Sequence, residues 1–158
     1  MAIDPDTFRA ALGRFTSGVT VVTTCDADGR DHGMTVSAFC SVSLEPPLVL
    51  ACIGHEASMH DLAMSADRFG VSILTVGQEQ LARRFADQWS DRFDGVGYSR
   101  GKLGVALLDD ALAHLECMVV DRRDAGDHTI VVGRVEAASC YQGRPLVYYR
   151  GGYTQLER

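Results

Sequence analysis

Short apolar runs rich in β-branched residues recur along the whole chain and are separated by turn signals. These runs span residues 19–24, 34–42, 48–53, 69–76, 111–120, 129–141 and 146–149. Runs of this length and composition predict β-strands. Asp28-Gly29 and the segment from Arg122 to Gly126 predict hairpin turns between consecutive strands. A chain organised in this way folds as an antiparallel β protein.

Helical patterns are few and short. Asp4-Pro5 is a typical helix start, and Phe8, Leu12 and Phe15 give the helix one apolar face before Gly18 ends it. Two further helices are predicted, one over residues 58–64 with a serine cap and one over residues 78–86.

Strands and helices therefore alternate too sparsely for a doubly wound parallel sheet, and an antiparallel barrel fits better. Pro46-Pro47 and Gly143-Arg144-Pro145 mark breaks between strands. Residues 87–106 form a long glycine-bearing excursion, and loops of this length usually have a function. With no internal repeat and no linker, we expect a single domain over residues 1–158.

Composition excludes several classes of protein. The 158 residues are 46% hydrophobic and 23% charged, which suits a globular domain with a core. A formal net charge of -6 without a basic run makes a nucleic-acid partner a poor candidate. No segment reaches the roughly 20 apolar residues of a membrane span, and the N-terminus does not resemble a signal peptide. The five cysteines include no C-x-x-C pair and lie among apolar strand residues, so we expect buried, reduced thiols and a cytoplasmic location.

Familiar catalytic motifs are absent from the sequence. There is no G-x-S-x-G elbow and no Walker loop, and no strand precedes the glycines of Gly95-Val96-Gly97-Tyr98. Cys52, His55 and His60 suggest zinc, but no second ligand pair follows at a suitable spacing. We therefore expect no metal site.

Three features remain open to two interpretations each. The strand of residues 33–39 either pairs its hydroxyls with neighbouring backbone or offers its edge to a flat heteroaromatic ligand. Ser58 at a helix start suits a phosphate, which Arg83 and Arg84 would clamp unless they are solvated surface residues. His128 follows a Gly-Asp turn, where it either contacts a substrate or lies at an ordinary hairpin edge.

Taken in order, the blocks of this sequence resemble the short-chain flavin reductase family, whose members reduce free flavin for two-component monooxygenases. The resemblance covers nearly the whole chain and rests on the order and spacing of the blocks. They are FRAALGRFTSGVTVVTT (8–24), HGMTVSAFCSVSLEPPLVLACI (32–53), RFGVSIL (68–74), QEQLARRFA (78–86), LAHLEC (112–117), AGDHTIVVGRVE (125–136) and PLVYYRGGY (145–153).

The resemblance implies a split β-barrel with a few short helices that binds FMN or FAD at the interface of a homodimer. By position, the isoalloxazine edge would be lined by Thr35, Val36, Ser37 and Ala38. Cys52 and Ile53 would lie beside the ring and ribityl chain, and the phosphate end would meet Ser58, Met59 and Arg84. Phe85 would lie on the ribityl or adenine side, while His128 and Tyr153 would flank the nicotinamide. The chain has Gly54 where relatives often have asparagine, and Ala57-Ser58 in place of a serine doublet, which leaves the choice between FMN and FAD open.

The expected activity is an NAD(P)H:flavin oxidoreductase that transfers hydride from NADH or NADPH to the flavin. Reduced flavin would then pass to a partner monooxygenase, with diffusion sufficient for the transfer. His128 is expected to position the nicotinamide and not to transfer a proton. Two alternatives remain: a split-barrel flavoprotein that reduces a cobalamin, a ferric chelate or a small organic molecule, and a non-catalytic flavin- or haem-binding module.

Overall fold

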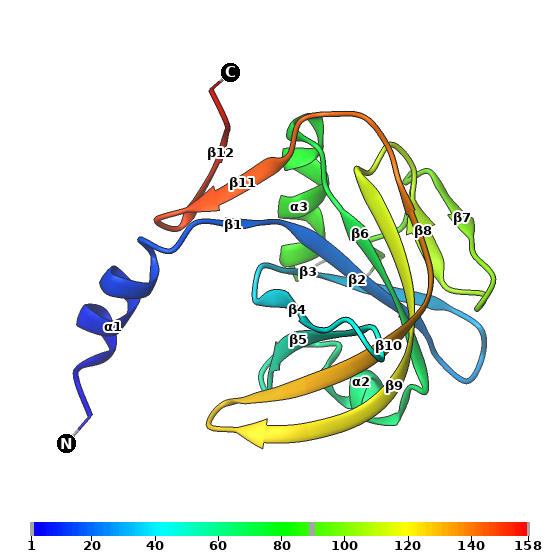
Figure 1. Ribbon diagram of the computed structural model, residues 1–158, viewed down its shortest axis with the longest axis horizontal. Helices are drawn as coiled ribbons and strands as arrows, with labels where there is room; N and C mark the ends of the chain where they lie inside the picture. The colour runs from blue at the N-terminus through cyan, green and yellow to red at the C-terminus, as the bar shows by residue number, and fades with distance from the viewer. Residues whose placement is uncertain (1, 89–90, 158) are drawn as a thin grey trace.

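The computed structural model describes residues 2–88 and 91–157, which form mainly antiparallel β-structure (Figure 1). The largest sheet in this part of the chain has seven strands in the order β3-β2-β6-β9-β10-β5-β4. Their bounds are β2 Thr20–Cys25, β3 Asp31–Val36, β4 Phe39–Ser43, β5 Leu48–Gly54, β6 Arg68–Ile73, β9 Ala113–Ala125 and β10 His128–Cys140. Two smaller sheets contain β1 Ser17–Gly18, β11 Leu146–Tyr149 and β12 Gly152–Gln155, and β7 Tyr98–Arg100 with β8 Ala106–Leu108. The predicted mainly β, antiparallel class is confirmed.

The hairpin between β2 and β3 forms where Asp28-Gly29 predicted it. Gly29 has a positive φ of 80°, a conformation that glycine adopts without steric cost. The Asp26 carboxylate accepts hydrogen bonds from the backbone N–H groups of Asp28 and Arg30, at 2.9 and 3.0 Å. Local turn chemistry is therefore sufficient to specify this hairpin.

The strand predicted over residues 34–42 is wrong, because the chain bends at Ser37-Ala38. β3 ends at Val36 and pairs with β2, whereas β4 begins at Phe39 and pairs with β5. β3 and β4 thus form the two edges of the same sheet although they are consecutive in the chain. The apolar pattern continues through the bend, so the change of partner leaves no signal in the sequence.

The predicted turn from Arg122 to Gly126 is also wrong, since β9 continues to Ala125 and only Gly126-Asp127 forms the turn. Residues 121–125 keep their pairing with β10 despite their polar side chains. Arg122 uses its guanidinium to bond the carbonyls of Ala63 and Ala66, at the end of helix α2. These contacts explain why a charged segment extends a strand here.

Helix α1, Pro5–Leu12, starts as predicted, with the Asp4 side chain accepting from the N–H groups of Asp6 and Thr7. It ends at Leu12, because residues 17–18 pair with β11 as strand β1, so the predicted end at Gly18 is wrong. None of its residues is buried, and Phe15 just beyond it is 80% exposed. In Figure 1 the helix lies off the main body at the N-terminal end.

The other helices are α2 His60–Ser65 and α3 Glu79–Ala86, the latter preceded by the 3-10 turn η1 Val76–Gln78. Helix α3 was predicted, and it buries Ala82 and Phe85 as its apolar face. Helix α2 is capped by Met59 without a side-chain hydrogen bond, so the predicted serine cap at Ser58 is wrong. No helix in the described part of the chain is long and apolar enough to cross a membrane.

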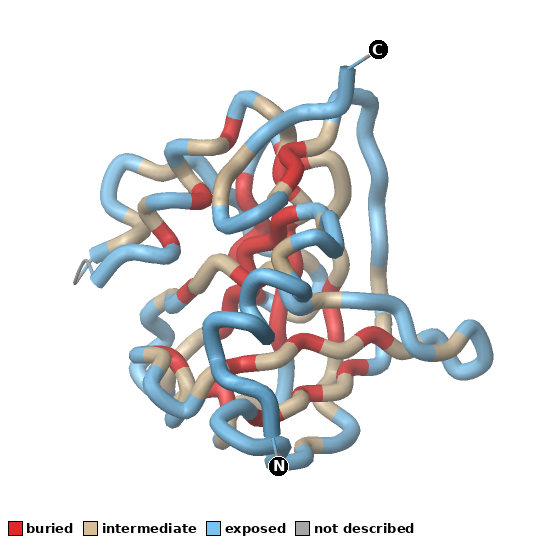
Figure 2. The backbone as a smooth tube through the Cα atoms, turned by 90° about the vertical axis from the view of Figure 1, so that its left-hand side faces the viewer, coloured by how far each residue is buried: buried red, intermediate tan, exposed pale blue. Residues whose placement is uncertain are grey.

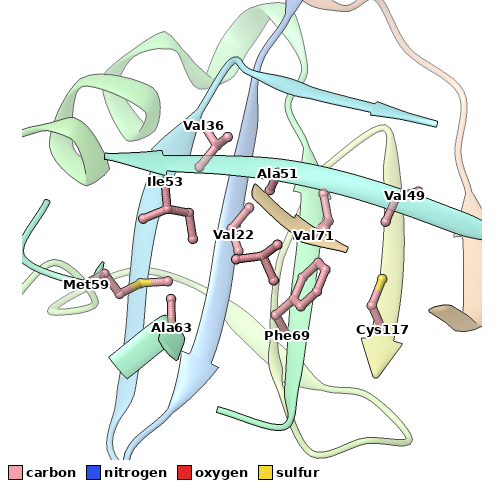
Figure 3. Packing of buried hydrophobic residues seen from close by; sticks show 11 residues of the cluster. Val22, Val36, Val49, Ala51, Ile53, Met59, Ala63, Phe69, Val71 and Cys117 are labelled. Carbon is pink, nitrogen blue, oxygen red and sulfur yellow. The ribbon is translucent and has the colours of Figure 1, made fainter. Parts of the chain in front are cut away.

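Buried residues gather along the centre of the sheet, whereas the N-terminal segment is exposed (Figure 2). One core cluster lies within the large sheet and includes Val22, Phe69, Val71 and Cys117 (Figure 3). A second joins β2 to α3 and β11 and is centred on Phe85.

All five cysteines are free thiols, as expected. Burial raises the pKa of Cys117 to about 12, so this thiol remains protonated at neutral pH. Cys40 and Cys140 are exposed, and the prediction that the thiols are buried is wrong for these two. Cys40 lies on the edge strand β4 and Cys140 ends β10, positions where the sheet gives little cover.

Candidate functional site

A hollow of about 820 Å³ lies beside the β2–β3 hairpin and the start of α2. Its volume falls within the roughly 300–1,000 Å³ typical of small-molecule sites. The lining residues are Gly29, Arg30, Asp31, His32, Gly33, Ser58, Met59, Gln88, Asp91, Arg92, Phe93, Tyr98 and Arg100. Arginine and hydroxyl groups among them suit a ligand that carries phosphate.

Arg92 lines this hollow together with Arg30 and Arg100. Its guanidinium donates to the carbonyl oxygens of Gly33 and Asp87, at 2.8 and 2.5 Å, and lies 3.5 Å from the Ser58 hydroxyl oxygen. Partial burial lowers the pKa of Arg92, and the charge of Asp87 opposes this effect. Arg92 and Ser58 together therefore present a cation and a hydroxyl to the same space.

The family resemblance implied that Arg84 meets the phosphate, but in the structure Arg84 contacts the backbone of the loop that carries Arg92. Its guanidinium donates to the carbonyls of Arg92 and Asp94, at 2.9 and 2.5 Å. These bonds anchor the loop that carries Arg92. Arg92 itself was missed by sequence reasoning, and the one available signal was its place in the long excursion of residues 87–106.

Another part of the wall of the hollow is formed by a cluster of polar side chains on β3 and β7. Arg100 forms a two-pronged ion pair with Asp31, both distances being 2.8 Å, and the Tyr98 hydroxyl donates to the same carboxylate at 3.0 Å. Burial alone would raise the pKa of Asp31, but the hydrogen bonds from Arg100 and Tyr98 outweigh it and lower that pKa. The excursion after α3 is thereby tied to the sheet.

The bend between the edge strands brings together several predicted ring-binding residues. The N–H of Cys52 donates to the carbonyl of Ala38 at 2.9 Å. Ser37, which precedes Ala38, lies in the same bend. Burial raises the pKa of the half-buried Cys52 thiol, with a further contribution from Cys40. The Thr35 hydroxyl instead donates to the carbonyl of Ala82 in α3, at 2.6 Å.

Four of the predicted binding residues have side chains in the core. Val36, Ile53 and Met59 belong to the cluster in the large sheet, where their side chains point into the interior (Figure 3). Phe85 is 0% exposed and packs behind Gly33, where a Cβ would lie 3.0 Å from its ring. Val36, Ile53 and Phe85 therefore support the site from the core, whereas Met59 also lines the hollow.

His128 is the first residue of β10 and lies between Gly54 of β5 and Ala125 of β9. Its Nδ1 is 2.7 Å from the Asp127 carboxylate, and 48% of its side chain is exposed. A Cβ on Gly54 would be 3.6 Å from the His128 Nε2. Gly54 and the imidazole of His128 are therefore direct neighbours across the two strands.

Tyr153, the other predicted nicotinamide residue, lies on β12. The guanidinium of Arg83 stacks on its ring at 5.0 Å from the centroid, and burial raises the pKa of its hydroxyl. In Figure 1 β12 is at the top of the molecule, whereas the turn between β9 and β10 is at the bottom. A single chain therefore does not bring His128 and Tyr153 together.

The possible zinc ligands do not converge. In residues 2–88 and 91–157, no group of three or more His, Cys, Asp or Glu side chains is placed to hold a metal ion. His60 has its Nε2 2.9 Å from the Thr129 hydroxyl oxygen, and its ring meets that of His55 edge-on at 4.9 Å.

A hollow of this volume with arginine and hydroxyl groups in its wall is compatible with a nucleotide-like cofactor. Residues 12–157 match the family model described as the flavin reductase like domain. The chain therefore belongs to the flavin reductase family.

Individual relatives agree with this assignment. The chain is 46% identical to an NADH-dependent flavin reductase of a Rhodococcus species, over 98% of this chain and 88% of the relative. It is 39% identical to the reductase subunit of a flavin-dependent monooxygenase of Mycobacterium tuberculosis, over 98% of this chain and 84% of that subunit. Among solved structures, it is similar to the NADH:FAD oxidoreductase of Streptomyces globisporus in complex with NAD and FAD fragments. The TM-score is 0.92 at 39% identity, with 99% of this chain and 97% of that chain covered.

Proposed function

We propose that this protein is an NAD(P)H:flavin oxidoreductase that transfers hydride from NADH or NADPH to FMN or FAD. The observation that carries the proposal is the pairing of Arg92 with Ser58 at the hollow, in a chain of the flavin reductase family. The bound flavin supplies the hydride-accepting ring, so the protein needs no nucleophile of its own. The task left to its residues is to bind and orient two ring systems.

The residues of the site fit a flavin from ring to phosphate. The Ser37-Ala38 bend and Cys52 would line the ring, and Ser58 with Arg92 would bind the phosphate. The hollow continues from Ser58 toward Arg30 and Tyr98 and is not lined by the residues of the bend. This space beyond the phosphate suits the adenosine half of FAD, and FMN would leave it unfilled.

The nicotinamide is proposed to lie between His128 and Tyr153. His128 donates or accepts through its exposed Nε2, because its Nδ1 is already held by Asp127. Neither residue is required to move a proton in the hydride step. Both serve to hold the nicotinamide against the flavin at a near-attack distance of about 3–3.5 Å.

A split β-barrel and a single domain over residues 1–158 are part of the proposal. The two edge strands β3 and β4 are joined only by Ser37-Ala38, so the sheet must curve until its edges approach each other at the bend. The N–H of Cys52 on β5 reaches the carbonyl of Ala38 in that bend. These contacts support a strongly curved, partly closed sheet.

A homodimer is proposed for two reasons. One chain can supply either His128 or Tyr153 to a given nicotinamide site but not both, and the apolar face of α1 is uncovered. Phe8, Leu12 and Phe15 on and after α1 are 54%, 52% and 80% exposed. Bulky apolar side chains in such a group mark an interaction surface. A second copy of the chain would cover this face and bring its own Tyr153 toward His128.

Changing Phe15 to aspartate tests the dimer. We expect the unmodified protein to sediment as a dimer and the variant as a monomer at micromolar concentration, because a charge would be buried at the contact. Sedimentation velocity with circular dichroism as a folding check measures both. The control is a substitution of Arg123, a surface residue whose side chain is 77% exposed. A Phe15→Asp protein that remains dimeric would contradict the proposed contact.

Reduced flavin is proposed to pass by diffusion to a partner monooxygenase. The similarity to the reductase subunit of a flavin-dependent monooxygenase supports such a partner. We also propose a cytoplasmic location, on the grounds that all five thiols are free.

The activity is tested by mixing the purified protein with NADH and excess FMN, FAD or riboflavin and following the NADH absorbance. We expect rapid oxidation with FMN or FAD, and a lower KM for FAD if the hollow holds its adenosine. Oxidation only in the presence of a cobalamin, ferric chelate or organic acceptor would instead identify a flavoprotein of another specificity. No oxidation with any flavin or acceptor would leave a binding module.

A further inference from the structure

A buried threonine links the tip of the β9–β10 hairpin to helix α2. Thr129 is 1% exposed, and its hydroxyl donates to the Asp124 carboxylate at 2.9 Å. The same oxygen lies 2.9 Å from His60 Nε2. Because a hydroxyl has a single hydrogen, which Asp124 accepts here, Nε2 of His60 must be the donor to Thr129. The bond is thus available whether His60 is neutral or charged.

His55 closes the same group from the segment that follows β5. Its Nε2 is 3.5 Å from Asp124 Oδ1, and its backbone N–H donates to the carbonyl of Asp127 at 2.8 Å. The hydrogen bond from Thr129 is the largest contribution to the lowered pKa of Asp124, and His55 adds to it. Asp124 therefore remains an anion and an acceptor at neutral pH. We refer to Thr129, Asp124, His60 and His55 as the tip network.

The tip network has no part in the hydride step. It nevertheless connects the strand that carries His128, at the proposed nicotinamide end of the site, to the segment that carries Ser58, at the proposed phosphate end. His128 and Thr129 are consecutive on β10, so their side chains point to opposite faces of the sheet. On one face His128 is held by Asp127, and on the other Thr129 is held by Asp124 and His60. The segment between His55 and His60 also carries Ser58, at the phosphate end.

We propose that Thr129 is a positioning residue for NADH, which acts through the tip network to hold His128 at a fixed place relative to Ser58 and the flavin. This inference rests on the proposed function. The backbone ladder pairs His128 with Gly54 and Ala125, and the N–H of His55 donates to the carbonyl of Asp127 at 2.8 Å, so the backbone at the hairpin tip is held from both neighbouring segments. The hydroxyl of Thr129 ties β10 to both β9 and α2 at the first interior position after His128.

The test compares Thr129→Val with Thr129→Ser. Valine keeps the shape of threonine and removes both hydrogen bonds, whereas serine keeps the hydroxyl and removes a methyl group. We expect Thr129→Val to raise the KM for NADH by about tenfold, with kcat and the KM for flavin changed less than about twofold. Thr129→Ser is expected to restore a KM close to that of the unmodified protein.

The control is Thr24→Val, which removes an equally buried hydroxyl that donates to the carbonyl of Arg68, at 2.8 Å, within the same sheet. We expect its KM for NADH to be unchanged. An unchanged KM in Thr129→Val would overturn the inference, as would a serine variant as impaired as the valine variant. Absence of NADH oxidation by the unmodified protein would instead refute the proposed function, so the two failures are distinguishable.

Discussion

Replacing Arg92 with methionine is expected to raise the KM for FMN and FAD by roughly ten- to a hundredfold and to leave riboflavin reduction nearly unchanged. Methionine fills much of the space of the side chain but has no charge and no donor. A charge-assisted hydrogen bond to phosphate contributes roughly 1.5–3 kcal/mol, which corresponds to this range of affinity. Riboflavin lacks the phosphate and so reports on the ring site alone.

Steady-state oxidation of NADH with each of the three flavins measures the effect. Arg92 also donates to the carbonyls of Gly33 and Asp87, so riboflavin reduction reveals any damage to the loop. A matched control is Arg68→Met, since Arg68 likewise donates to a backbone carbonyl, that of Leu103, away from the hollow. Equal losses for riboflavin and FMN would show that Arg92 supports the fold and does not bind phosphate.

The parts of the fold that follow from neighbouring residues could be predicted from the sequence. The turn at Asp28-Gly29 and the start of α1 at Asp4-Pro5 each depend on contacts within a few residues, and both occur as expected. The strands were visible for the same reason, because their apolar content is a local property. Strand pairing is a long-range property, and it explains the error at Ser37-Ala38, where the chain changes partner without a change in pattern.

The proposed binding residues divide in the same way between local and long-range signals. Ser58 and His128, the proposed phosphate and nicotinamide contacts, were recognisable because each lies near a local feature. Ser58 is two residues before α2, and His128 follows a tight turn. Arg92 was not recognisable, because its importance comes from the approach of the long excursion to Gly33 and Ser58, which are distant in sequence. Core positions such as Phe85 resemble ligand contacts in sequence, since aromatic side chains suit both roles, and only burial distinguishes them.

His128→Ala is the second substitution with a large expected effect, and it acts on NADH and not on flavin. We expect the KM for NADH to rise by about tenfold or more while kcat changes little. Loss of one or two hydrogen bonds to a bound ligand corresponds to roughly 1.4 kcal/mol, or a factor of ten. The KM for FMN and FAD is expected to stay the same, because the proposed phosphate contacts lie at Ser58 and Arg92.

Whether His128→Ala changes KM or kcat decides which role His128 has. A residue that binds substrate and transition state equally affects KM alone, whereas a proton donor in the chemical step would lower kcat. Arg123→Ala is the control, since Arg123 is on the same hairpin, is largely exposed and forms an ion pair with Asp121. A collapse of kcat at unchanged KM would contradict the positioning role. It would also remove the basis for Thr129 as a positioning residue, because the tip network matters for NADH only if His128 binds it.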